Sequence, residues 1–247
     1  MSIGAQESRK LNKSYNVFHQ FNKLAYFGWP LGKRANLPFY SQPQAGKILW
    51  QMDSLYDRIQ ESIRYISSQV SEKPAVGVVL GSGWWNFIRE LDQPQGIDFS
   101  NIPHFLPTHL GKKSGGLIIG RLGQLPVACL IGRLHTYEGF TVHEVSYPVR
   151  VLGAWGIKVL FVTNAAGGIN PRFSPEDLML ICDHINMTGE NPLKGEEEEK
   201  LGQRFLDMTR AYDPTFIRLA RAVARKLGIK LRKGVYVGVN GPVYETP

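Results

Sequence analysis

Residues 76–83 read Val-Gly-Val-Val-Leu-Gly-Ser-Gly, and this stretch decides the fold. Its first part, Val76–Leu80, is a continuous apolar run, which is typical of a strand buried on both faces of a parallel sheet. A Gly81-Ser82-Gly83 turn follows and leads toward an expected helix. Ligands of such sheets bind beyond the carboxyl ends of the strands. The stretch therefore predicts both an α/β fold and the place of its site.

Strands and helices alternate outward from this stretch. Helices are predicted where a capping residue (Asp53 or Ser54, Thr141, Asp213) precedes apolar residues at helical spacing. The last of them begins at Pro214 and has Ile217, Ala220, Val223 and Leu227 as its predicted inner stripe. Further strands are predicted at 117–119, 127–131, 159–163, 178–181 and 235–239. Alternation of this kind predicts an α/β fold with a mixed, mostly parallel, twisted central sheet flanked by helices on both faces.

The composition indicates a globular protein of the cytoplasm. With 43% hydrophobic and 20% charged residues, the 247-residue chain can build one ample core. Its longest apolar runs, such as Val159–Val162, are far shorter than the roughly 20 residues that cross a bilayer. The N-terminus lacks the pattern of a secretory signal. The two cysteines, Cys129 and Cys182, exclude a disulfide scaffold and lack zinc-type spacing, so no metal site is expected. The short apolar runs likewise give no reason to expect a membrane partner.

The net charge of +8 belongs mostly to the first fifth of the chain: residues 1–51 carry +6, and the remaining residues only +2. A nearly neutral body does not indicate a nucleic-acid partner. Three interpretations of residues 1–51 stand open: a disordered basic arm, a partner-binding tail, or translated sequence outside the natural protein. We favour the last and expect Met52 to be the original initiator. The expected division is thus an extension, 1–51, and a domain, 52–247.

Three segments after predicted strands carry candidate chemistry. The Gly81-Ser82-Gly83 turn can direct backbone N–H groups and one hydroxyl at an anion, although a plain tight turn fits equally well. In residues 132–139, Gly-Arg-Leu-His-Thr-Tyr-Glu-Gly, Arg133 and His135 can both donate to a phosphate oxygen, and Tyr137 shares their side. An ordinary surface loop is the alternative. The small residues at 164–168 allow a close approach of backbone to ligand. Walker and serine-hydrolase patterns are missing around Ser82.

Six motifs stand out in order along the chain: Gly81-Ser82-Gly83, Gly-Arg-x-His-x-Tyr-Glu-Gly at 132–139, Val-Thr-Asn-Ala-Ala-Gly-Gly at 162–168, Asp-His-Ile-Asn at 183–186, Asn-Pro-Leu at 191–193 and Gly-Pro-Val-Tyr-Glu-Thr-Pro at 241–247. In this order and spacing they closely resemble the trimeric type of purine nucleoside phosphorylase. The resemblance runs from about residue 55 to the end of the chain.

The resemblance implies an enzyme of purine salvage that converts a purine nucleoside and phosphate to free purine and ribose 1-phosphate. It implies no cofactor beyond phosphate as co-substrate, and a homotrimer. On matching positions, the phosphate would be held by Ser82, Arg133, His135 and the backbone of Ala165, with Leu134 contributing main chain only. Arg133 and His135 would be the catalytic pair. The nucleoside would contact Tyr137 at the ribose, Tyr244 at the base and Glu245 at the N1/N2 edge of a 6-oxopurine.

The sequence departs from the family in two places. Where the family has Gly-His-x-Gly, this chain has Gly-Lys-Lys-Ser-Gly at 111–115, so Lys113 or the nearby His109 would have to replace a phosphate-site histidine. The chain also ends at Pro247, whereas the family continues with further strands, a purine-binding asparagine and a closing helix. We therefore expect 52–247 to lack its C-terminal part. An active phosphorylase, a methylthioadenosine phosphorylase and a catalytically incomplete fragment remain as alternatives.

Overall fold

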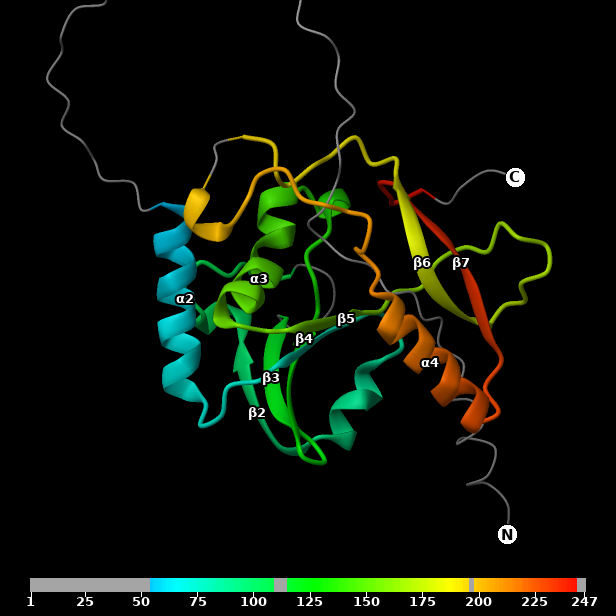
Figure 1. Cartoon of the computed structure of the whole chain (residues 1–247). Coiled ribbons are helices and arrows are strands. Elements are labelled where there is room, and N and C mark those ends of the chain that lie inside the picture. Colours follow the sequence, from blue (N-terminus) through cyan, green and yellow to red (C-terminus); the bar gives the residue numbers. More distant parts are fainter. Residues whose placement is uncertain (1–53, 109–114, 196–197, 244–247) are drawn as a thin grey trace, which may run out of the picture.

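The computed structural model describes residues 54–108, 115–195 and 198–243, and its centre is a five-stranded mixed sheet (Figure 1). The strand order is β2-β3-β4-β1-β5. β1 pairs in parallel with β4 and β5, whereas β3 is antiparallel to both β2 and β4. The bounds of the strands are Val76–Leu80 for β1, Asp92–Asp98 for β2, Gly116–Leu122 for β3, Leu125–Ile131 for β4 and Val159–Val162 for β5.

Alternation along the central strands divides the core between the two faces of the sheet. Successive side chains of a strand point to opposite faces. Val79 therefore packs in one apolar cluster with Ala128 and Leu130, while its neighbour Val78 packs in the other with Cys129. This double burial explains why the strand at 76–80 is apolar without interruption.

Helices α2 (Leu55–Gln69) and α3 (Val142–Trp155) lie side by side over one face of the sheet (Figure 1). Both begin with a capping box: the Thr141–Glu144 box of α3 was predicted, whereas for α2 the sequence left the cap open between Asp53 and Ser54, and the structure selects Ser54, which pairs with Asp57. The opposite face is covered by the short 3₁₀ helix η1 (Trp85–Glu90), whose Phe87 and Ile88 pack on the second cluster. The predicted helix after Gly83 is therefore a 3₁₀ helix. Three more short 3₁₀ turns are η2 (Phe99–Asn101), η3 (Thr136–Glu138) and η4 (Glu199–Leu201).

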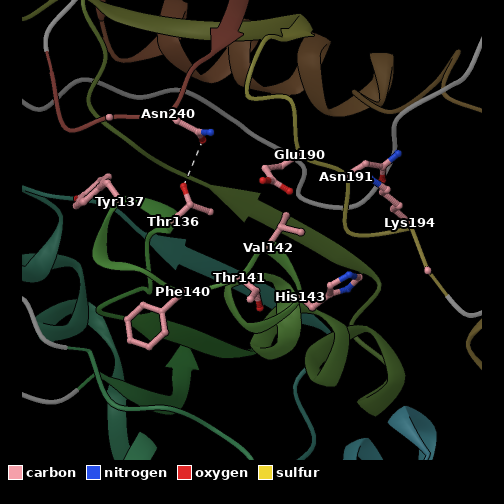
Figure 2. A pocket seen from close by; sticks show the side chains of 12 residues that line it. Thr136, Tyr137, Phe140, Thr141, Val142, His143, Glu190, Asn191, Lys194 and Asn240 are labelled. Carbon is pink, nitrogen blue, oxygen red and sulfur yellow. Dashed lines mark hydrogen bonds between the residues drawn. The ribbon is translucent and has the colours of Figure 1, made fainter.

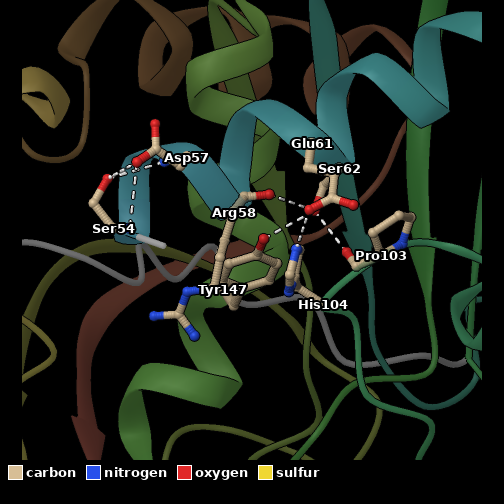
Figure 3. A network of polar contacts seen from close by, with 8 residues as sticks. All are labelled: Ser54, Asp57, Arg58, Glu61, Ser62, Pro103, His104 and Tyr147. Carbon is tan, nitrogen blue, oxygen red and sulfur yellow. Dashed lines mark hydrogen bonds and ion pairs between the residues drawn. The ribbon is translucent and has the colours of Figure 1, made fainter. Parts of the chain in front are cut away.

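A buried polar contact joins α2 to α3 (Figure 3). The Ser62 hydroxyl, which is fully buried, lies 2.8 Å from the Tyr147 hydroxyl and donates to the Pro103 carbonyl at 2.7 Å. Burial raises the pKa of Tyr147, while the contact with Ser62 opposes that change. Glu61, the residue directly before Ser62 in α2, has its Oε2 2.7 Å from His104 Nε2. These contacts fix the segment after β2 against α2.

The C-terminal elements form a second layer. β6 (Leu178–Asn186) and β7 (Leu231–Gly238) pair in parallel as a separate two-stranded sheet, although the sequence had suggested one continuous sheet. Helix α4 (Pro214–Lys226) lies beside them (Figure 1) and reaches the central sheet through a ring contact of Phe216 with Phe161.

The inner stripe predicted for α4 was wrong in its second half. Val223 is 46% exposed and Leu227 is 63% exposed, whereas Ala224 is buried. The inner face follows Ile217, Ala220 and Ala224 instead, at spacings of three and four residues. One residue along a helix turns the side chain by about 100°, so choosing 223 in place of 224 moves the stripe off the packed face.

Candidate phosphate and nucleoside site

Three strand ends meet at one edge of the central sheet. Leu80 of β1 is in register with Ile131 of β4, and Val79 of β1 with Val162 of β5. Because the three strands are parallel, the segments that follow them leave the sheet at the same edge. The Gly81-Ser82-Gly83 turn, residues 132–139 and residues 163–168 are thereby brought together, as the sequence predicted.

Thr163 ties the first and third of these segments to each other. Its hydroxyl donates to the Val79 carbonyl at 3.1 Å and accepts from the Gly81 backbone N–H at 2.9 Å. A Cβ on Gly81 would collide with the backbone of Thr163 and Asn164. Glycine is required at position 81 because the two backbones approach so closely there, and this leaves the Ser82 turn held by the end of β5.

Arg133 joins the second segment to the same place. Its Nη1 donates to the Thr163 carbonyl at 3.2 Å. Burial lowers the pKa of Arg133 from its ordinary value, with Tyr137 and Tyr236 opposing the change. An arginine stays charged even so, and a partly desolvated guanidinium attracts an anion more strongly than an exposed one. The side chain is thus suited to hold an oxyanion at this edge.

His135 is oriented by Glu138, three residues later. Its backbone N–H and its ring Nδ1 lie 3.1 and 2.7 Å from Oε1 of Glu138, whose side chain is only 5% exposed. A carboxylate only accepts hydrogen bonds, so Nδ1 carries the hydrogen and a neutral ring leaves Nε2 as an acceptor. Burial lowers the pKa of His135, although the hydrogen bond with Glu138 opposes this, so the neutral ring predominates at pH 7.

Tyr137 stacks on His135 and borders a cavity. The two ring centroids are 4.6 Å apart and the planes differ by 18°. Tyr137 and Thr136 line a cavity of about 570 Å³ together with residues 140–143, 190–191, 194–195 and 240–241 (Figure 2). Asn240 faces Thr136 across one end of it. A second cavity of about 740 Å³, between α2, α3 and residues 192–195 and 200–204, has none of the predicted site residues in its lining.

The remaining predicted residues divide into three groups. Ser82 and Ala165 are exposed at the shared edge, so both are accessible to a ligand. Leu134 is 4% exposed and its side chain belongs to the core, in keeping with the expectation that it offers main chain only. His109, Lys113, Tyr244 and Glu245 lie outside the described residues, as do residues 1–51.

Sequence reasoning missed three residues that shape this site: Glu138, Thr163 and Asn240. Glu138 could have been found from its spacing, since an acidic residue three positions after His135 at a turn is a capping pattern. Thr163 had a weaker signal as the polar residue that ends an apolar strand. Asn240 had none, because its contacts are with Thr136 and Thr188, far away in the sequence.

Comparisons with known proteins agree with this geometry. Residues 75–247 match the sequence profile of the Phosphorylase superfamily. Purine nucleoside phosphorylase 1 of Bacillus subtilis is 43% identical over 191 residues, which cover 77% of this chain and 70% of the relative. The chain therefore belongs to the purine nucleoside phosphorylase family. The enzyme of that name from Bos taurus is 40% identical over 202 residues, covering 77% of this chain and 68% of the relative.

A solved structure extends the family likeness to the fold. Isoform 2 of the Schistosoma mansoni purine nucleoside phosphorylase, in complex with cytosine and ribose-1-phosphate, superposes with a TM-score of 0.74 at 35% identity, covering 77% of this chain and 69% of the other. The predicted family and the mixed α/β fold are thereby confirmed. In the described ranges no helix combines the length and apolarity needed to span a bilayer, and no three His, Cys, Asp or Glu side chains gather where they could hold a metal ion.

Proposed function

We propose that this family member catalyses the reversible phosphorolysis of purine nucleosides of the inosine and guanosine type, giving free purine and ribose 1-phosphate. The meeting of Arg133, His135 and the Ser82 turn at one edge of the sheet carries the proposal. It supplies a partly buried cation, an oriented imidazole and an accessible hydroxyl within one set of adjoining segments. The relatives named purine nucleoside phosphorylase support the same reaction.

The phosphate-binding set would be Ser82, Arg133, His135 and the main chain of Leu134 and Ala165. Arg133 offers a planar fork of donors that matches phosphate oxygens. The neutral ring of His135, with Nδ1–H held by Glu138, presents Nε2 to the O–H of monohydrogen phosphate. Arg133 and His135 are thus the catalytic pair of the proposal, and inorganic phosphate is its only co-substrate.

In the reaction, a phosphate oxygen bonds to C1′ of the ribose while the C1′–N9 bond breaks, and the bonding pair leaves on the purine. Glycosidic bonds break through transition states with oxocarbenium character. The phosphate dianion offsets the positive charge that develops on the ribose, and no enzymic nucleophile is needed. The purine anion then takes a proton from water, and the ribose 1-phosphate that forms releases the O–H proton of the former monohydrogen phosphate, so that protons and charge balance. The residues at the sheet edge act by holding phosphate in line with the bond that breaks.

The nucleoside would lie beside Tyr137. Its ring is 43% exposed at the cavity, so it can cover a ribose face. Tyr244 would pack on the base and Glu245 would accept hydrogen bonds from the N1/N2 edge of a 6-oxopurine. A 6-aminopurine lacks the N1–H donor, which favours inosine over methylthioadenosine as substrate.

The proposal extends to assembly and setting: a homotrimer that acts in purine salvage in the cytoplasm. Exposed apolar side chains after β6 support an interface. Met187 is 67% exposed and Phe205 is 82% exposed, and a neighbouring subunit that covered them would remove their apolar surface from water. Light scattering of the purified chain measures the oligomeric state directly.

Phosphate-dependent conversion of inosine to hypoxanthine by residues 1–247 tests the proposed function, with residues 52–247 assayed in parallel. Turnover that requires phosphate and is faster with inosine than with methylthioadenosine supports it. Preference for methylthioadenosine assigns the runner-up substrate. Folded protein that converts neither nucleoside identifies a catalytically incomplete chain.

A further inference from the structure

Asn240 connects two segments that are remote in sequence. Its side-chain Nδ2 donates to the Thr188 carbonyl at 2.8 Å, and its Oδ1 accepts from the Thr136 hydroxyl at 3.3 Å (Figure 2). Thr136, which lies between His135 and Tyr137 in the sequence, opens the η3 turn, and Asn240 follows β7. One amide thus links the candidate phosphate segment to the end of the second sheet.

The Thr188 side of this link is itself anchored. Thr188 donates its backbone N–H and its hydroxyl to Asn186 Oδ1 at 2.9 and 2.7 Å. The Met187 N–H donates to the Gly238 carbonyl at 2.8 Å, which extends the pairing of β6 with β7. The carbonyl that Asn240 binds therefore belongs to a well-bonded turn, so it can restrain the weaker contact on the Thr136 side.

Packing strengthens the Thr136 side. Gly241 lies so close to the Tyr137 ring that a Cβ at position 241 would be 3.2 Å from Tyr137 Cδ1. Tyr137 in turn stacks on His135. Movement of the 240–241 segment would therefore be transmitted through Tyr137 to the imidazole, while the 3.3 Å hydrogen bond holds Thr136 at the start of the same turn.

We propose that Asn240 is a positioning residue, whose amide holds the η3 turn against the β6–β7 layer and thereby keeps Tyr137 and His135 in place for substrate. Its catalytic consequence rests on the proposed function. In this role Asn240 acts through its contact with Thr136 and through the packing of its neighbour Gly241 on Tyr137. Its loss should loosen the turn and weaken phosphate binding more than it slows the bound reaction.

Amide hydrogen exchange in the full chain measures the turn without requiring activity. The N–H groups of Glu138 and Gly139 close the turn by donating to His135 and Thr136 carbonyls, each at 3.0 Å. In Asn240→Ala and Thr136→Val we expect both amides to exchange about three- to tenfold faster. The net free energy of one hydrogen bond changes an opening equilibrium by about that factor. Thr136→Ser keeps the hydroxyl and should exchange like the parent. Thr209→Val removes a comparable hydroxyl contact to Asp207 before α4 and should also match the parent.

Steady-state kinetics of the same variants tests the catalytic part. Asn240→Ala should raise KM for phosphate about three- to tenfold and change kcat less, and the double variant with Thr136→Val should be no worse than Asn240→Ala alone. Parent-like exchange and KM in Asn240→Ala overturn the inference. So does equal acceleration of the β4 amides, which would mark general destabilisation. If the parent itself does not turn over inosine, the proposed function and the catalytic role of Asn240 fail. The exchange data still decide whether Asn240 holds the η3 turn in place.

Discussion

Glu138 binds His135 twice through one oxygen: Oε1 accepts from the backbone N–H at 3.1 Å and from ring Nδ1 at 2.7 Å. The same carboxylate therefore shapes the turn and selects the tautomer of the imidazole. Because the side chain of Glu138 is only 5% exposed, water competes poorly for these bonds. Glu138 thereby determines that Nε2 is the ring nitrogen left available to the phosphate of the proposed function.

Removing this carboxylate should impair turnover. In Glu138→Ala, His135 loses its orienting acceptor, and we expect kcat/KM for phosphate to fall about tenfold to a hundredfold, the equivalent of ~1–3 kcal/mol for a buried charged hydrogen bond. Glu138→Gln retains an acceptor oxygen and should lose less. Steady-state kinetics at pH 7 measures both variants. Parent-like kinetics in Glu138→Ala, with intact folding, contradicts the role of Glu138.

Arg133 should be more sensitive to shape than to charge. Lysine in its place preserves the charge but not the fork of donors. We expect Arg133→Lys to raise KM for phosphate about tenfold or more, and Arg133→Met to raise it further, with smaller changes in KM for inosine. Measuring both KM values separates phosphate binding from nucleoside binding. An increase in KM for inosine without an increase in KM for phosphate would contradict the phosphate-binding role of Arg133.

The elements that the sequence predicted correctly are those whose signals come from residues close together in the chain. The capping box at Thr141 and the apolar run at 76–80 involve neighbours in sequence, and both were predicted, while the cap of α2 was narrowed to Asp53 or Ser54, of which the structure uses Ser54. β2 was missed, since its residues 92–96 are exposed and it carries no apolar alternation. The separation of β6 and β7 from the central sheet depends on pairing between distant segments, which periodicity does not encode.

The candidate site shows the same division. Ser82, Arg133 and His135 follow predicted strands, and parallel pairing of those strands is sufficient to bring their segments to one edge. The contacts of Thr163 and Asn240 depend instead on atomic approach, such as the lack of space at Gly81. A sequence shows which residue types follow a predicted strand. It does not show which distant residues their side chains contact in the folded chain.

Gly81→Ala tests the tight approach of β1 and β5. A methyl group there meets the Thr163 carbonyl and has no space to occupy, so we expect a loss of ~1–3 kcal/mol in unfolding free energy. Gly153→Ala in α3 is the matched control, because a methyl group at position 153 meets nothing within 4 Å. There we expect a gain of ~0.5–1 kcal/mol from helix propensity. Urea denaturation measures both. Equal effects of the two substitutions would show that position 81 is not crowded.

The Ser62–Tyr147 contact should show strong coupling (Figure 3). Ser62→Ala leaves the buried Tyr147 hydroxyl without this partner, and we expect a cost of ~1–3 kcal/mol. Tyr147→Phe should also destabilise, but adding it to Ser62→Ala should cost little more, because both ends of the contact are then removed. A double-mutant cycle of unfolding free energies measures the coupling. Strict additivity would indicate that the two hydroxyls do not share a bond.

The lowered pKa of Asp177 predicts how the free energy of unfolding changes in acid. It accepts hydrogen bonds from the Ser174 N–H at 3.0 Å and from Arg232 Nε at 2.8 Å, and these lower its pKa from an ordinary 3.8 to about 2. Since the folded pKa is the lower one, the stabilising contribution is full above about pH 4 and is lost as the pH falls toward 2.

Replacing Asp177 with Asn should remove that contribution. Above about pH 4 the parent should be more stable than Asp177→Asn, and the difference should shrink steadily as the pH falls from about 4 toward about 2. Urea unfolding free energies at several values between pH 6 and about pH 2.5 measure it, with Asp92→Asn on the exposed part of β2 as control. A difference between parent and Asp177→Asn that stays constant across this range would show that the carboxylate is not preferentially ionised in the folded chain, and that the link between residue 174 and β7 does not depend on its charge.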